Sequence, residues 1–109
     1  QELVPSPTFG PTRKWAEGDL YLDGCILELK TTESQTFSLR FLRQLVGYAA
    51  LAWRFGVDGA TTRPDSIGVY FCRTGRWRMF ELNEVVRDHE ETLPALADFL
   101  VQARVSVTP

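Results

Sequence analysis

The sequence lacks any apolar run long enough to cross a membrane. Its longest run covers residues 45–53 and lies between Arg43 and Arg54, whereas a transmembrane helix needs about 20 apolar residues. No basic-then-apolar signal segment opens the chain. We therefore expect a cytoplasmic protein without a membrane partner.

Soft metal ligands are also scarce. The chain contains two cysteines, Cys25 and Cys72, and a single histidine, His89. The cysteines form no Cys-x-x-Cys pair, which argues against zinc and against an iron–sulfur cluster. We expect both thiols to be buried and reduced and the histidine to lie on the surface of an acidic helix.

The chain has no overall excess of positive charge, since 12 Lys+Arg stand against 14 Asp+Glu. The acidic residues are concentrated at the end: residues 81–109 hold six acidic and two basic residues, and residues 1–80 hold eight acidic and ten basic ones. Arg73, Arg76 and Arg78 are close together in the sequence; they could follow a phosphate backbone or, equally well, lie on a solvated hairpin end. Net charge alone therefore does not exclude a nucleic-acid partner for the first 80 residues.

The N-terminal half predicts an extended arm, a β-hairpin and a helix. Residues 1–13 contain three prolines and read as an arm, and residues 14–109 as a single domain. Strands are expected at about 14–22 and 25–31, because Asp23-Gly24 between alternating apolar residues is a strong hairpin signal. A long helix is expected over residues 37–55, where small residues would let it lie close to a sheet.

The C-terminal half predicts a second hairpin and two helices. Strands are expected at 67–73 and 76–82, followed by a helix capped by Asn83 and a final helix with Pro94 in its first turn. The resulting order is β-β-α-β-β-α, an α/β domain with a mixed sheet of four to five strands. Apolar residues on both faces of the first hairpin predict helices on both faces of this sheet.

The first hairpin carries a chemical signal. With Asp23-Gly24 as a two-residue turn, Asp19 falls opposite Glu28 at a position where Cβ atoms are roughly 4.5–5.5 Å apart. Facing carboxylates repel each other unless a cation lies between them or one is protonated. Mg²⁺ suits such oxygen ligands, and the Leu29 carbonyl could add a further one. Lys30 follows on the same face and could act on a metal-bound water or a phosphate; alternatively, Lys30 pairs with Glu17 on a solvated face.

These residues resemble a known family. The pattern Asp19, Glu28-Leu29-Lys30 and Gln44-x-x-x-Tyr48 resembles the core of the PD-(D/E)XK nuclease superfamily, in its RecB-like and phage-exonuclease-like branch. The resemblance covers residues 14–55 by motif and residues 66–104 by element order. It implies a restriction-endonuclease-like fold and a nuclease that hydrolyses phosphodiester bonds, here in single- or double-stranded DNA.

The resemblance also implies a role for each matching residue. Asp19, Glu28 and the Leu29 carbonyl would bind Mg²⁺ or Mn²⁺, and Lys30 would be the catalytic lysine. Gln44 and Tyr48 would complete the catalytic site and contact DNA. A further reading of the arginines adds DNA contacts from Arg40, which shares a helix face with Gln44 and Tyr48, from Arg43 and from Arg76.

Two departures from the family keep a second hypothesis open. RecB-like nucleases usually have a helix before the sheet, whereas the 18 residues before Asp19 are rich in proline; we expect that helix to be missing from the chain or the fold to be minimal. Cluster-binding relatives use four cysteines, and this chain has two. The alternative is an inactive nuclease-fold module that binds nucleic acid or a protein. Either could work as a homo-oligomer or within a larger helicase–nuclease assembly.

Overall fold

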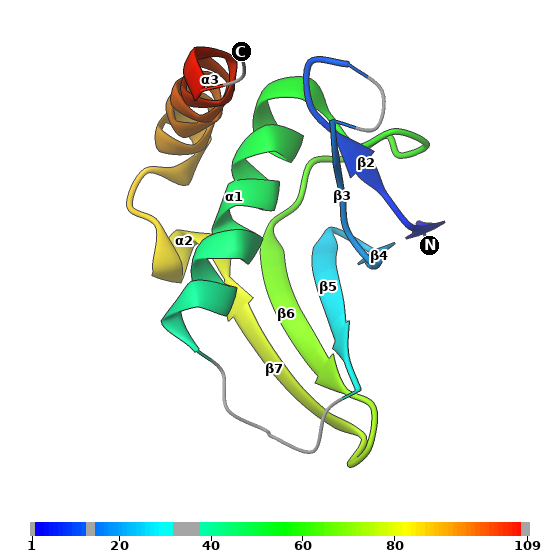
Figure 1. The fold of residues 1–109 in the computed structure, drawn as a ribbon. Coiled ribbons are helices and arrows are strands. Elements are labelled where there is room, and N and C mark those ends of the chain that lie inside the picture. The colour runs from blue at the N-terminus through cyan, green and yellow to red at the C-terminus, as the bar shows by residue number, and fades with distance from the viewer. Residues whose placement is uncertain (1, 13–14, 32–37, 108–109) are drawn as a thin grey trace.

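The computed structural model describes residues 2–12, 15–31 and 38–107 (Figure 1). Within these residues, five strands form one mixed sheet, two short strands form a second sheet, and there are three helices. The strands and helices are β1 (Leu3–Pro5), β2 (Thr8–Phe9), β3 (Ala16–Glu17), β4 (Leu20–Leu22), β5 (Cys25–Lys30), α1 (Leu39–Phe55), β6 (Ser66–Phe71), β7 (Arg76–Glu81), α2 (Leu82–Val85) and α3 (His89–Val107).

The main sheet has the order β1-β4-β5-β6-β7. Its pairs are antiparallel except β5 with β6, which run parallel and are joined by α1. A parallel pair requires such a crossover, and a helix is its usual form. The predicted α/β class and mixed sheet are confirmed at this level. The segment read as an arm is extended, but β1 joins the main sheet and β2 pairs with β3, so the chain has more strands before α1 than the two expected.

The first hairpin forms as predicted around its turn. Asp23 and Gly24 have φ values of 46° and 85°, the left-handed pair that a tight hairpin turn requires. The predicted partners of Leu20, Tyr21 and Leu22 are confirmed as Leu27, Ile26 and Cys25. The ladder stops there, because the expected single strand over 14–22 is broken between β3 and β4.

Helix α1 begins and ends at recognisable sequence signals. The Ser38 hydroxyl accepts a hydrogen bond from the Phe41 N–H at 3.1 Å, which caps the first turn. Gly56, with φ of 86°, ends the helix. Leu45, Ala49 and Ala52 are fully buried and belong to the same core cluster as Ile26 and Ile67 of the sheet. The small residues therefore do bring this helix close to the strands. Residues 32–37, where the polar loop and the helix start were expected, lie outside the described residues.

The helices cover one face of the sheet, not both as the sequence suggested. Helix α1 lies across the sheet, and α3 packs against α1 on the side away from β4 (Figure 1). Arg54 of α1 and Asp98 of α3 form an ion pair at 3.1 Å. Apolar residues do lie on both faces of the hairpin, but among the described residues no helix packs on the second face. An apolar face in a sequence does not reveal what covers it.

The structure differs from three other expectations for the C-terminal half of the chain. Asn83 lies inside the one-turn helix α2, whose N-cap is Glu81. Pro94 lies within α3 rather than in its first turn; the helix begins earlier because the Asp88 carbonyl accepts the N–H groups of Glu91 and Thr92. Of the two free thiols, Cys25 is buried as expected, whereas Cys72 is exposed in the turn after β6.

Candidate active site

The site begins where the chain crosses from the small sheet to the main sheet. Gly18 and Asp19 join β3 to β4 and are held there by the N-terminal segment: the Gly18 N–H donates to the Pro7 carbonyl at 2.9 Å, and the Ser6 N–H donates to the Asp19 carbonyl at 3.0 Å. The Asp19 carboxylate accepts the Leu29 N–H at 2.9 Å. A side chain therefore occupies the place where a partner strand would accept this hydrogen bond.

The Leu29 carbonyl points toward the same edge. In a strand, the N–H and C=O of one residue point to the same side, and the next residue points to the other side. The Leu29 N–H points to Asp19, and the Lys30 carbonyl accepts the Cys72 N–H on the β6 side at 2.9 Å. The Leu29 carbonyl therefore lies on the Asp19 side of β5. This is the placement that the proposed third oxygen ligand needs.

Glu28 faces α1 and lies against Asp19. It alternates along β5 with the buried Ile26, so it shares the face that α1 covers. The Glu28 carboxyl oxygen Oε1 accepts the Asp19 N–H at 3.3 Å. Partial burial, with the neighbouring Asp19 charge as the second cause, raises the pKa of Glu28 to about 7. The predicted pairing of two carboxyl groups is therefore present, although Asp19 lies outside the strand ladder.

Lys30 lies beneath the first turns of α1. Its Nζ is 5.5 Å from the centroid of the Phe41 ring and 6.0 Å from that of Phe71. A hollow of about 330 Å³ opens beside it. The hollow is lined by Leu29, Lys30, Ser38, Arg40, Phe41 and Gln44. Three of the candidate polar side chains, Lys30 from β5 and Arg40 and Gln44 from the helix that follows it, therefore line one cavity.

Gln44 and Tyr48 are joined to each other and to the N-terminal segment. The Gln44 amide nitrogen donates to the Tyr48 hydroxyl at 2.9 Å. The Tyr48 ring packs on Phe9, with 5.5 Å between ring centroids. A Cβ on Gly18 would lie 3.5 Å from the Phe9 ring and 3.4 Å from the Glu28 carboxyl. Phe9 thus links the helix to the carboxyl pair; sequence reasoning missed it, since the only signal was one aromatic residue between prolines.

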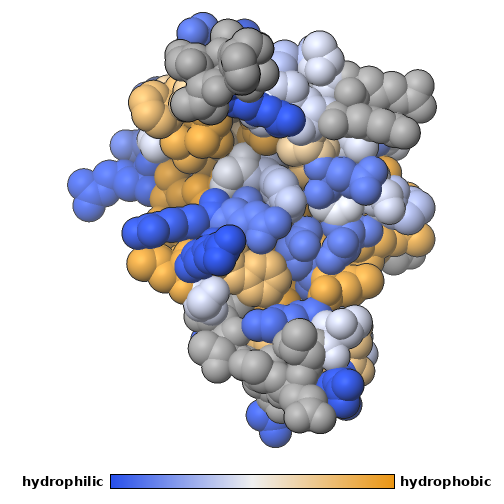
Figure 2. Space-filling view, in the orientation of Figure 1, coloured by the Kyte–Doolittle hydropathy of each residue, from blue (hydrophilic) through white to orange (hydrophobic). Residues whose placement is uncertain are grey.

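The remaining candidates lie further out. Arg43 lines a different groove, apolar and about 340 Å³, where α1 meets α2 and α3. Arg76 is exposed at the start of β7 and shares a row with Phe71 and Lys30 across three strands, so it is about two strand spacings, ~10 Å, from Lys30. The alternative partner for Lys30 is not brought opposite it, because Glu17 pairs with Thr8 in the small sheet. Figure 2 shows hydrophilic side chains gathered across this side of the molecule, over α1 and the neighbouring strands.

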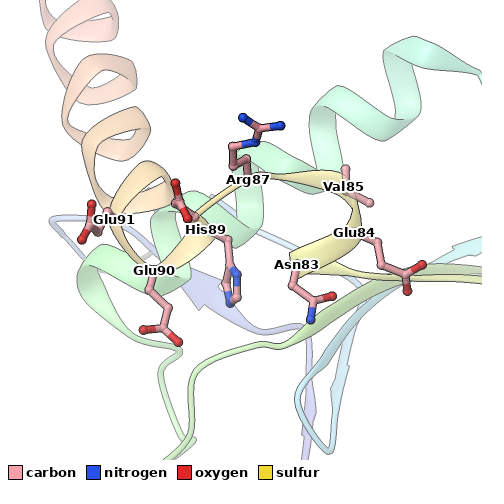
Figure 3. A pocket seen from close by; sticks show the side chains of 8 residues that line it. Asn83, Glu84, Val85, Arg87, His89, Glu90 and Glu91 are labelled. Atoms are coloured by element: carbon pink, nitrogen blue, oxygen red, sulfur yellow. The ribbon is translucent and has the colours of Figure 1, made fainter.

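A larger hollow lies elsewhere on the described surface. It measures about 760 Å³ and lies between α2 and the start of α3. Its glutamates, Glu84, Glu90 and Glu91, point in different directions (Figure 3). His89 lines this hollow and is partly buried, because its ring packs edge-on to Trp53 with 5.2 Å between ring centroids. The diverging acids make this a poorer candidate than the Asp19–Glu28 edge.

Two further observations bound the site. Within residues 2–12, 15–31 and 38–107, no group of three or more His, Cys, Asp or Glu side chains is arranged to hold a metal ion. In the same part of the chain, no helix is both long and apolar enough to span a bilayer. Comparison of the chain with protein-family models, with curated proteins and with solved structures gives no match.

Proposed function

We propose that this domain is a metal-dependent nuclease that hydrolyses phosphodiester bonds in DNA, with a restriction-endonuclease-like core. The observation that carries the proposal is the contact between Asp19 and Glu28 just beyond the end of the β4–β5 ladder, with Lys30 two residues after Glu28 on the same strand face. Two facing carboxyl groups destabilise a purely structural hairpin. They become favourable when a cation or a proton is shared between them.

The residues present fit a hard divalent cation. Mg²⁺ is commonly held by one or two carboxylates together with waters and substrate phosphate oxygens, so a set of three protein ligands from His, Cys, Asp or Glu is not required. Asp19, Glu28 and the Leu29 carbonyl supply only oxygen donors. The raised pKa of Glu28 shows that its anion is poorly stabilised by the protein alone. Bound Mg²⁺ or Mn²⁺ would supply a positive charge for that anion, activate water and offset charge on the phosphate.

The side chains beside the carboxyl pair can position a nucleic-acid backbone. Lys30, Arg40 and Gln44 line the same hollow, and ammonium, guanidinium and amide groups are all phosphate donors. The Tyr48 hydroxyl holds the Gln44 amide in place. In the proposed reaction, Lys30 orients the scissile phosphate and offsets its developing charge, Arg40 binds the neighbouring phosphate, and Arg76 contacts the backbone further along.

The test is cleavage of circular and linear DNA by the purified chain with Mg²⁺ or Mn²⁺. Lys30→Ala should reduce the rate by at least about 100-fold, the usual contribution of a charged group that stabilises a transition state. Arg87→Ala, an exposed arginine between α2 and α3, is the matched control and should cut like the wild type. Thermal unfolding of each variant shows that the fold is retained.

Each outcome of this test separates two hypotheses. Equal activity in the wild type and Lys30→Ala would refute the assigned mechanism and indicate a contaminating enzyme. DNA binding without cleavage, together with no Mg²⁺ or Mn²⁺ binding by calorimetry, would refute the enzyme and leave the inactive binding module. An RNA substrate of the same sequence tests whether DNA is the preferred substrate.

A further inference from the structure

Phe9 is buried although it lies in a two-residue strand near the start of the chain. It belongs to β2 and is only 2% exposed. Strand β2 lies beside α1 (Figure 1), and the residue before Phe9 ties it to the loop after that helix. The Asp58 N–H donates to the Thr8 carbonyl at 3.2 Å, and the Thr8 hydroxyl donates to the Asp58 carboxylate at 2.6 Å. Contacts outside the candidate active site therefore hold Phe9 in place.

The Phe9 ring contacts two parts of the candidate active site that come from different elements. It packs against the Tyr48 ring, with 5.5 Å between centroids and 37° between the ring planes, and the Tyr48 hydroxyl accepts the hydrogen bond of the Gln44 amide at 2.9 Å. The same ring reaches Gly18, where a Cβ would lie 3.5 Å from the Phe9 Cζ and 3.4 Å from the Glu28 Oε1. One side chain therefore joins the helix part of the site to its carboxyl part.

Gly18 passes this contact on to Asp19, the next residue. The Asp19 carboxylate accepts the Leu29 N–H at 2.9 Å, and the Asp19 N–H donates to the Glu28 Oε1 at 3.3 Å. Asp19 precedes the first residue of the β4–β5 ladder, so both bonds depend on where the link between β3 and β4 lies. Phe9 borders that link through Gly18 and through the pairing of β2 with β3.

We propose that Phe9 is a positioning residue of the candidate active site, whose ring keeps the Asp19 backbone and the Tyr48–Gln44 pair at a fixed separation. Its effect on cleavage rests on the proposed nuclease function, whereas its effect on the position of Asp19 does not. Reacting groups must be held within about 0.5 Å of their productive geometry by side chains that packing locks in place. A displacement of about 1 Å can reduce a rate about 100-fold. A rigid, enclosed ring between two parts of the site meets this need, and a smaller side chain would let the two parts move independently.

The first test compares DNA cleavage by the wild type and by Phe9→Leu at saturating Mg²⁺ or Mn²⁺. Leucine keeps this position apolar but removes the ring, so kcat should fall at least about 10-fold. The KM for DNA should stay within about twofold, because Lys30 and Arg40 line a hollow that Phe9 does not line. Leu93→Val is the matched control, since Leu93 of α3 is fully buried in the same core cluster. Its variant should have a lower melting temperature and an unchanged kcat.

The second test needs no catalysis. Because the Asp19 carboxylate holds the Leu29 N–H, the hydrogen-exchange rate of this amide measures how firmly Asp19 is held. The amide should exchange at least about 10-fold faster in Phe9→Leu than in the wild type, and at the wild-type rate in Leu93→Val. The amides of the central strand β6 are the internal reference for opening of the whole domain. Phe9→Met, whose flexible side chain refills the space without a ring, replaces Phe9→Leu should that variant unfold.

Unchanged exchange of the Leu29 amide in the Phe9 variants would overturn the proposal, whatever their cleavage rates. So would a kcat that falls as far in Leu93→Val as in Phe9→Leu, because the loss would then reflect a general loosening of the core. A raised KM with an unchanged kcat would overturn it as well, since Phe9 would then serve substrate binding. A wild type that cleaves no DNA would refute the proposed function, and faster Leu29 exchange in Phe9→Leu alone would still show that the ring positions Asp19.

Discussion

The carboxyl pair predicts an unusual dependence of stability on pH. Burial, and after it the charge of Asp19, raises the pKa of Glu28 from 4.5 to about 7 in the folded chain. Below pH 4.5 the group is protonated in both the folded and the unfolded chain and contributes no pH dependence. Between pH 4.5 and 7 the unfolded chain releases this proton while the folded chain retains it, so the free energy of unfolding falls as pH rises. Above about pH 7 the loss is complete and constant.

The size of this loss follows from the shift. A displacement from 4.5 to about 7 corresponds to about 3.4 kcal/mol at 1.36 kcal/mol per unit. Glu28 is only partly buried, and solvent screening of a partly exposed group reduces such a value to about 1–2 kcal/mol. The wild type should therefore lose about 1–2 kcal/mol relative to Glu28→Gln between pH ~4.5 and ~7, because glutamine does not ionise.

Urea unfolding of both proteins at several pH values, with a chelator present, measures this difference. Asp19→Asn should reduce the pH-dependent loss without abolishing it, since burial is the larger cause of the shift. Millimolar Mg²⁺ should restore the wild type above pH 7 by binding the ionised pair, and should not affect Glu28→Gln to the same extent. A difference between wild type and Glu28→Gln that is flat with pH would refute the coupled pair, and a wild type indifferent to Mg²⁺ would refute the cation site.

Two further substitutions test how the N-terminal segment and the sheet are held. The Glu2 carboxylate accepts hydrogen bonds from the Thr62 hydroxyl and from the N–H and hydroxyl of Thr61, and these bonds lower the pKa of Glu2 to about 2. The stability that the ionised Glu2 contributes is therefore present above pH 4.5 and is lost as the pH falls toward 2. Glu2→Gln should lower the melting temperature at pH 7 and should remove this acid-dependent loss of stability. Gly68→Ala should cost about 1–3 kcal/mol, because its Cβ would lie 2.9 Å from the Arg78 carbonyl oxygen; Gly47→Ala, whose Cβ would lie 3.9 Å from Leu100, is the control and should be neutral or stabilising in chemical denaturation.

Two local signals in the N-terminal half of the sequence predicted element ends correctly. Asp23-Gly24 fixed the first hairpin turn and its register, and Gly56 fixed the end of α1. What covers each face of the sheet was beyond reach, because an apolar strand residue looks the same under a helix, under a second subunit or in water. The continuous helix through Pro94 was also missed, since proline marks a preferred start of a helix without forbidding later positions.

The sequence indicated which residues belong to the candidate site, but it did not indicate the contacts that these residues make with the rest of the chain. Spacing alone placed Glu28 and Lys30 on one strand face and Arg40 with Gln44 on one helix face. It could not show that Arg43, one residue from Gln44, lines a separate apolar groove with residues of α2 and α3. Nor could it show that Phe9 joins Tyr48 to Gly18, because that contact depends on where the N-terminal segment folds back.

The chemistry of the site depends on where a ladder stops. If the β4–β5 ladder had continued to Gly18, Gly18 would have paired with Leu29, and the N–H and the carbonyl of Leu29 would both have been hydrogen-bonded to Gly18. Instead, the Gly18 N–H is taken by Pro7 and the Leu29 N–H by the Asp19 carboxylate. Because β3 pairs with β2 in the small sheet, the chain before Leu20 does not pair with β5, and the hairpin ladder ends at Leu20 and Leu27. Two carboxyl groups and a backbone carbonyl lie beside one another on this side of β5, so the proline-rich N-terminal segment is needed to build the proposed site.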